Sequence, residues 1–137
     1  MKVSADPKTA FSVLIVEDNL SACNIICRTV SMRFPFAVIY SADNGITGLE
    51  LFKKHTPDIV VTDISMPEMN GLEMAAEIQS LTSDTSFIVF TGHSEGDYLK
   101  NFNEIGIYHY LLKPLDLAEL ISTINECLKA RHLKTMS

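Results

Sequence analysis

At 137 residues, of which 47% are hydrophobic and 20% charged, the chain is long enough to bury the core of one soluble globular domain. No apolar run approaches the ~20 residues that a membrane-spanning helix needs. The N-terminus lacks the positive and then apolar pattern of a secretory signal, and the net charge of −6 argues against direct binding of nucleic acid. We therefore expect a cytoplasmic domain that contacts neither membrane nor nucleic acid directly.

The cysteines do not predict a metal site or a disulfide framework. Cys23 and Cys27 lie one helical turn apart, and Cys127 is far from both in sequence, so the paired spacing of a zinc site is missing. We interpret all three as buried free thiols in a reducing cytoplasm.

Five short apolar segments alternate along the chain with amphipathic ones. The apolar segments predict strands at 11–16, 36–40, 59–62, 87–90 and 108–112. The amphipathic segments predict helices at 19–34, 43–55, 70–81, 95–104 and 116–130. We expect residues 1–10 to form a loose tail, residues 11–130 the domain, and residues 131–137 a frayed end.

Potential caps support these helix starts. Asp43 can cap the second helix, and the pairs Asn70 and Glu73, and Asp116 and Glu119, have capping-box spacing. Alternating strands and helices are typical of a parallel sheet with helices on both faces. We therefore predict an α/β, three-layer, doubly wound fold.

The segment 59–62 consists of four β-branched residues, which predicts a strand buried on both of its faces. Asp63 follows directly at its carboxyl end. Pro67 then prevents continuation of the strand, and Asn70-Gly71 is typical of a turn.

Polar side chains end four of the five predicted strands. Glu17 and Asp18 follow the first, Asp63 the third, Thr91 the fourth and Lys113 the fifth. The carboxyl ends of parallel strands share one edge of a sheet, where ligands bind in open α/β folds. Each residue alone has an ordinary alternative role, as a helix cap, a strand-end threonine or a solvated lysine. Three carboxylates and one lysine together favour a site in which Mg²⁺ balances the remaining charge.

Taken in order, Glu17-Asp18, Asp63 followed by I-S-M-P, Thr91-Gly92 and Lys113-Pro114 resemble the receiver domain of two-component response regulators. The resemblance covers about residues 11–130. It implies a flavodoxin-like (βα)5 fold with a five-stranded parallel sheet in the strand order 2-1-3-4-5. It also implies a cis peptide bond between Lys113 and Pro114.

The same resemblance implies a role for each strand-end residue. Asp63 is expected to be the phosphoacceptor, taking a phosphoryl group from a phosphohistidine of a sensor histidine kinase or a phosphotransfer protein. Glu17, Asp18, Asp63 and the backbone carbonyl of Ser65 are expected to hold Mg²⁺. Lys113 is expected to pair first with Asp63 and then with the phosphoryl oxygens.

For the response to phosphorylation, the resemblance implies a switch made by Thr91 and Tyr110. The face formed by the fourth helix, the fifth strand and the fifth helix would then contact a downstream output domain or protein, or a second copy in a homodimer formed on phosphorylation. Such a domain takes part in its own phosphotransfer and slow dephosphorylation but is not otherwise an enzyme.

Two alternatives stay open at this point. A phosphohydrolase of the haloacid-dehalogenase kind also uses an Asp nucleophile and Mg²⁺, but it needs an acid where this chain has Ser65. A module that binds partners without phosphorylation is the second alternative. Ser65 and His93 occupy the positions that vary around the phosphorylation site, and Gly92 stands where alanine is usual. We expect Ser65 and His93 to influence the lifetime of the phosphoryl group.

Overall fold

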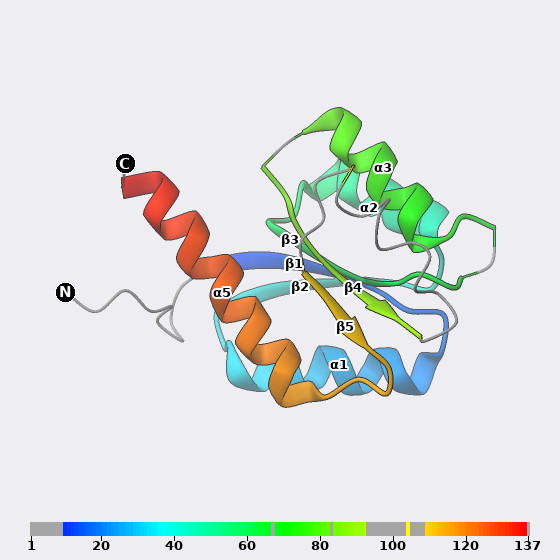
Figure 1. Ribbon diagram of the computed structural model, residues 1–137, viewed down its shortest axis with the longest axis horizontal. Helices are drawn as coiled ribbons and strands as arrows, with labels where there is room; N and C mark the ends of the chain where they lie inside the picture. Colours follow the sequence, from blue (N-terminus) through cyan, green and yellow to red (C-terminus); the bar gives the residue numbers. More distant parts are fainter. Residues whose placement is uncertain (1–9, 67, 83, 93–103, 105–108, 137) are drawn as a thin grey trace.

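The structure is a computed structural model that describes residues 10–66, 68–82, 84–92, 104 and 109–136. Five parallel strands form one sheet in the order β2-β1-β3-β4-β5 (Figure 1). This order is the one predicted from the family resemblance. The strands are β1 (Phe11–Val16), β2 (Ala37–Ala42), β3 (Ile59–Asp63), β4 (Ser86–Thr91) and β5 (His109–Leu112).

Helices cover both faces of the sheet, which confirms the predicted three-layer doubly wound fold. They are α1 (Leu20–Arg33), α2 (Gly45–His55), α3 (Gly71–Leu81) and α5 (Leu117–Met136). In Figure 1, α1 and α5 lie on one side of the sheet and α2 and α3 on the other. Apart from Glu104, the helix expected at 95–104 lies outside the described residues.

The sheet separates two apolar cores. Ile15 and Val61 pack in the core beneath α1 and α5, whereas Leu14 and Val60 pack in the core beneath α2 and α3. Neighbouring residues of one strand serve opposite cores because side chains alternate across a sheet. All residues of β3 are buried, as its β-branched sequence predicts, so this central strand holds Asp63 rigidly at its end.

The helix caps are only partly those predicted from sequence. Asn70 and Glu73 form the expected capping box at the start of α3. The prediction that Asp43 caps α2 is wrong, because the side chain of Asn44 accepts the hydrogen bond from the backbone N–H of Thr47, at 2.8 Å. Asp43 instead accepts a hydrogen bond from the Asn44 side chain, which orients that cap.

Several element boundaries also differ from the prediction: β2 ends at Ala42 and not at 40, β3 includes Asp63, and β4 covers Ser86–Thr91 and not 87–90. β2 begins at Ala37, not 36, because the Ala37 N–H donates to the Phe34 carbonyl in a turn that precedes the strand. In the structure α5 continues to Met136, and the fraying expected of residues 131–137 stays a prediction. Arg131 fixes this part of α5 by an ion pair with Asp58, at 2.9 Å. Within the described residues, no helix is both long and apolar enough to cross a membrane.

Candidate functional site

The predicted acidic residues meet at the carboxyl edge of the sheet. Asp63 is the last residue of β3 and is 4% exposed, Glu17 follows β1 directly, and Asp18 is the next residue and is exposed. One carboxylate oxygen from each of the three lies within 4.8 Å of the others. The neighbouring parallel strands β1 and β3 produce this arrangement, since their register brings Val16 beside Thr62.

Lys113 reaches the same place from the connection between β5 and α5. Its ammonium group lies 2.8 Å from Oδ1 and 2.9 Å from Oδ2 of Asp63, so it contacts both oxygens of the carboxylate. The backbone N–H of Lys113 donates to the Thr91 carbonyl at 2.9 Å, which ties this connection to the end of β4. The peptide bond between Lys113 and Pro114 is cis, as expected.

The backbone around Asp63 is held by contacts that the sequence analysis missed. The hydroxyl of Thr62 donates to the Asp63 carbonyl oxygen at 2.9 Å, and the Gly71 N–H donates to the Ile64 carbonyl at 2.9 Å. A Cβ atom at position 71 would lie 2.1 Å from the Asp63 carbonyl oxygen. Gly71 is therefore required by a close backbone approach, although the sequence suggested only turn chemistry.

The Asp63 side chain is also oriented by the loop that follows it. The backbone N–H of Ser65 donates to Oδ1 of Asp63 at 3.3 Å. Together with Lys113, this hydrogen bond fixes the carboxylate at the edge of the sheet. A carboxylate oxygen held in one orientation is what nucleophilic chemistry at this residue needs.

The three acids carry more negative charge than Lys113 alone compensates, and the pKa of Glu17 among them is raised. Burial, a hydrogen bond shared with Asp18 and the charge of Asp63 raise the pKa of Glu17 from 4.5 to about 7. The N–H of Asn19 opposes this shift by donating to Glu17, at 3.4 Å. A cation bound among the three acids would favour their ionised forms.

The chemistry of these donors fits a hard divalent cation such as Mg²⁺. Carboxylate oxygens are preferred ligands of Mg²⁺, and the ion usually binds through one or two protein carboxylates together with water and phosphate oxygens. Glu17, Asp18 and Asp63 supply such oxygens close together. The residues present therefore could hold the metal that the sequence predicts.

Thr91 and Tyr110 occupy neighbouring strands beside the acids. Thr91 ends β4, is 1% exposed, and donates its hydroxyl to the Gly92 carbonyl at 3.2 Å. Tyr110 pairs with Val89, two residues before Thr91, so both side chains lie on one face of the sheet. Tyr110 is 38% exposed. His93 lies outside the described residues.

An open cavity of about 370 Å³ adjoins the site between the start of α1 and the β5–α5 connection. Glu17 and Lys113 line it beside apolar side chains, including Ile25, Leu115 and Leu117. Ile25 is exposed on α1. The cavity gives the charged site an apolar approach from solvent.

Comparison with known proteins agrees with this geometry. The family model of the response regulator receiver domain matches residues 13–125. The transcriptional regulatory protein HptR of Staphylococcus aureus is 36% identical over 80% of this chain, and the match covers 43% of HptR. The uncharacterized transcriptional regulatory protein YesN of Bacillus subtilis is 37% identical over 66% of the chain and 24% of YesN. The chain thus spans less than half the length of either relative.

Solved structures show the same similarity. The N-terminal domain of an uncharacterized protein from Wolinella succinogenes is 34% identical with a TM-score of 0.80, covering 93% of this chain and 98% of that one. A response regulator receiver domain protein from Clostridium thermocellum is 25% identical with a TM-score of 0.83, covering 90% and 98%. The chain therefore belongs to the family of response regulator receiver domains of two-component signalling.

Proposed function

We propose that this domain is a phosphorylation-dependent switch, with Asp63 as the residue that accepts the phosphoryl group. The observation that carries the proposal is the buried Asp63 carboxylate, held by Lys113 and by the Ser65 N–H within reach of two further acids. The donor is a phosphohistidine of a sensor histidine kinase or of a phosphotransfer protein. We infer that the donor approaches through the apolar cavity beside Lys113 and Ile25.

Mg²⁺ would be held by Glu17, Asp18 and Asp63, with the backbone carbonyl of Ser65 as a further ligand. When bound, the ion neutralises negative charge on the acids and on the phosphoryl oxygens. This role fits the raised pKa of Glu17, which burial causes first, with contributions from the hydrogen bond to Asp18 and from the charge of Asp63.

In the transfer step, a carboxylate oxygen of Asp63 attacks phosphorus in line with the bond to the donor histidine. The new O–P bond makes an acyl phosphate, and the N–P bond breaks with its electron pair going to the imidazole nitrogen. Lys113 already contacts both Asp63 oxygens. Its ammonium group therefore stabilises the equatorial phosphoryl oxygens without large movement.

The switch follows from the new charge and acceptors at Asp63. The phosphoryl group adds about −1.5 to −2 charge and strong acceptor oxygens. The Thr91 hydroxyl, which now donates to the Gly92 carbonyl, can exchange that weak bond for a phosphoryl oxygen. Its movement leaves room for the exposed Tyr110 ring to turn inward. The surface around β5 and α5 then differs between the two states and presents the signal to an output domain or protein.

We propose that the domain is cytoplasmic. The domain is proposed to act there without catalysing reactions on other substrates. The alternative of a phosphohydrolase is weakened by Ser65, which cannot serve as the second acid. Sustained turnover of p-nitrophenyl phosphate would favour that alternative instead.

The test uses a small phosphodonor, so that the kinase need not be known. Incubate the chain with acetyl phosphate, with and without Mg²⁺, and follow the intact mass over time. We expect one phosphoryl group to be added in the presence of Mg²⁺, and the reaction to slow by at least about tenfold in its absence. An Asp18→Asn variant should lose most of the Mg²⁺ effect, whereas a Glu77→Gln variant, altered at an exposed acid of α3, should behave like wild type. A rate of phosphorylation that is the same with and without Mg²⁺ would contradict the proposal.

A further inference from the structure

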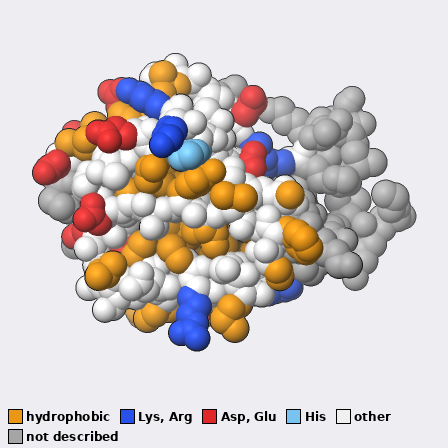
Figure 2. Space-filling model, turned by 180° about the vertical axis from the view of Figure 1, so that it is seen from behind, with side chains coloured by type: hydrophobic (Ala, Val, Ile, Leu, Met, Phe, Trp, Pro, Cys, Tyr) orange, Lys and Arg blue, Asp and Glu red, His pale blue; other side chains and the backbone are white. Residues whose placement is uncertain are grey.

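The outer edge of β2 is an apolar sheet edge that no described strand covers. β2 is the end strand of the sheet, so its backbone groups on the side away from β1 pair with no other strand of the described chain. Val38 is 52% exposed, and Phe36, which precedes the strand, is 54% exposed. Figure 2, which views the molecule from behind, shows apolar side chains gathered in the middle of this face.

The exposure arises because α2 ends too early to cover the whole strand. The Tyr40 ring stacks on His55, the last residue of α2, with ring centroids 4.1 Å apart. Val38 lies on the same face of the sheet as Tyr40 but beyond that stack, since side chains two residues apart share a face. The end of α2 thus leaves Val38 open to solvent.

The edge also lacks the usual features that prevent strand pairing. Natural edge strands are protected by lysine or other charged residues, by proline or by bulges. The segment 36–42, FAVIYSA, contains no charged residue and no proline. It pairs with β1 residue for residue from Ala37 to Ala42, without a bulge. Such an edge is competent to accept a further strand.

The charges around the edge differ between its two ends. Acids lie at the end where β2 finishes: Asp43 follows the strand, and the Glu17 N–H bonds to the Ala42 carbonyl, which brings the acidic site beside it. Basic residues occupy the last turns of the flanking helices, Arg33 in α1 and Lys53 and Lys54 in α2. In Figure 2, most of the acids of this face lie toward its left side.

We propose that this edge is a dimer interface, in which β2 pairs antiparallel with β2 of a second copy of the chain. A two-fold axis brings the same patch of both copies together. Antiparallel pairing places the acidic end of one β2 edge near the basic end of the other, in both halves of the interface. Parallel pairing of the two β2 strands would instead place ends of like charge together. A two-fold axis perpendicular to the strands also gives only the antiparallel arrangement.

The arrangement leaves signalling surfaces free. β5 is at the opposite edge of the sheet from β2. The two sheets would join through their β2 strands, with β5 and α5 of each copy at the outside. The association therefore does not require phosphorylation of Asp63, which separates this proposal from a dimer formed through the β5–α5 face.

Sedimentation velocity over a concentration series tests the interface with a matched pair of variants. Val38 and Leu112 are 52% and 55% exposed on the two opposite edge strands, so Val38→Lys and Leu112→Lys make the same change at similar exposure. We expect Val38→Lys to raise the dimer dissociation constant by at least about tenfold, since an edge lysine opposes strand pairing. Leu112→Lys and Asp63→Asn should associate like wild type. Added salt should weaken the dimer, because the charged ends are exposed.

Hydrogen exchange locates the contact independently of the variants. The amides of residues 37–42 should gain protection as the concentration of the wild-type chain rises, while those of β5 should not. A wild-type chain that remains monomeric up to millimolar concentration overturns the proposal. So does an association that Leu112→Lys abolishes and Val38→Lys leaves intact.

Discussion

Asp63 and Lys113 form the contact on which the proposed chemistry depends. The carboxylate is almost fully buried, whereas the lysine side chain is 38% exposed and enters from the loop after β5. A buried carboxylate needs a compensating charge or hydrogen bonds, because its transfer from water is costly. The flexible stem of Lys113 lets one ammonium group serve Asp63 before transfer and the phosphoryl oxygens afterwards.

The geometry of the charged group at position 113 should matter as well as its positive charge. Lys113→Arg keeps the positive charge but replaces a compact ammonium group with a planar fork. We expect the rate of phosphorylation by acetyl phosphate to fall by about tenfold or more, because the fork cannot occupy the same position between both Asp63 oxygens. Lys54→Arg, at an exposed position of α2, is the control. An unchanged rate in Lys113→Arg would show that position 113 needs only a positive charge.

The raised pKa of Glu17 leads to a second prediction, about the stability of the protein without metal. The pKa of Glu17 is raised to about 7 in the folded protein, so between its ordinary value of 4.5 and about 7 the folded state holds a proton that the unfolded chain releases. The stability that this proton contributes is fully present below pH 4.5 and is lost as the pH rises through about 7. The Glu17→Gln variant replaces the titrating carboxyl group with a neutral amide, which carries no charge at any of these pH values.

At pH 8 without Mg²⁺, we expect Glu17→Gln to melt a few degrees higher than wild type. The difference should shrink toward pH 5, and Mg²⁺ should stabilise the wild type preferentially. Thermal unfolding followed by circular dichroism measures this, with Glu77→Gln as the control. Equal melting temperatures of wild type and Glu17→Gln at pH 8 would mean that the acids do not destabilise the metal-free fold.

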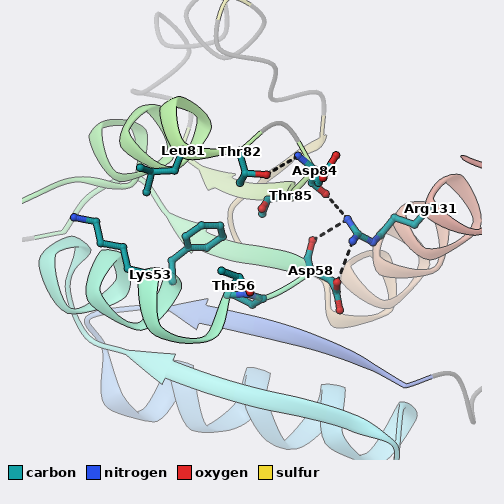
Figure 3. A pocket seen from close by; sticks show the side chains of 10 residues that line it. Lys53, Thr56, Asp58, Leu81, Thr82, Asp84, Thr85 and Arg131 are labelled. Atoms are coloured by element: carbon teal, nitrogen blue, oxygen red, sulfur yellow. Dashed lines mark hydrogen bonds and ion pairs between the residues drawn. The ribbon is translucent and has the colours of Figure 1, made fainter. Parts of the chain in front are cut away.

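At the scale of elements, α5 is anchored where the strands begin, which is the end of the sheet opposite the acidic site. Figure 3 shows Arg131 reaching from α5 to Asp58 at the start of β3 and to Asp84 before β4. Asp58 also accepts a hydrogen bond from the Ser12 N–H of β1, at 2.9 Å. These groups border a cavity of about 460 Å³ whose lining includes Phe52 of α2 and Leu81 of α3. Arg131 thus connects α5 with the segments that lead into β3 and β4, and Asp58 extends this connection to β1.

Loss of this anchor should affect the end of α5 more than the site. We expect Arg131→Gln to lower the free energy of unfolding by about 1–2 kcal/mol, below the full value of buried charged hydrogen bonds because the pair is partly exposed. The amides of residues 129–136 should exchange faster, while acetyl phosphate labelling changes little. Lys129→Gln, two residues earlier in α5, provides the control. Equal exchange in both variants would show that Arg131 does not hold the helix end.

Features set by neighbouring residues could be predicted from the sequence, whereas features that depend on contacts between distant residues could not. The approximate positions of the strands and the Asn70 cap could be predicted because strand composition and capping spacing act over a few residues. The choice between Asp43 and Asn44 could not, because both side chains accept hydrogen bonds and only the backbone path decides which reaches Thr47. The Asp58–Arg131 pair joins residues 73 positions apart, and no local pattern marks it.

The same reasoning applies within the site. The ends of parallel strands meet at one edge, so the meeting of Glu17, Asp63 and Lys113 followed from the strand pattern alone. The need for glycine at position 71 did not, because it arises from the carbonyl oxygen of Asp63 across a folded loop. Sequence therefore indicated the groups that carry charge, and the structure supplied the backbone contacts that orient them.

At the scale of the whole molecule, the sheet connects the acidic site with the β5–α5 face. Thr91 ends β4 beside Leu112 of β5, and Lys113 follows Leu112 directly. A change at Asp63 therefore has two short routes to this face, one through Thr91 and one through Lys113. A phosphoryl group shifts the balance between two states only by interacting differently with them.

Nuclear magnetic resonance with and without beryllofluoride, a phosphoryl mimic, tests this connection. With Mg²⁺ present, we expect chemical shift changes at Thr91, Tyr110 and the first turns of α5, and smaller changes in β2. Thr91→Ala should keep the changes next to Asp63 and lose those at Tyr110, because the hydroxyl that moves is missing. Changes confined to the neighbours of Asp63 in the wild type would refute the switch.

The proposed function requires that Asp63, and not Glu17 or Asp18, accepts the phosphoryl group. Glu17, Asp18 and Asp63 lie so close together that intact mass cannot distinguish them. The most direct measurement is peptide mass spectrometry after phosphorylation in Mg²⁺, with the unstable acyl phosphate first trapped by borohydride reduction. We predict the modification at Asp63 in the wild type and none in Asp63→Asn. Modification at Glu17 or Asp18, or undiminished labelling of Asp63→Asn, would contradict the proposed function.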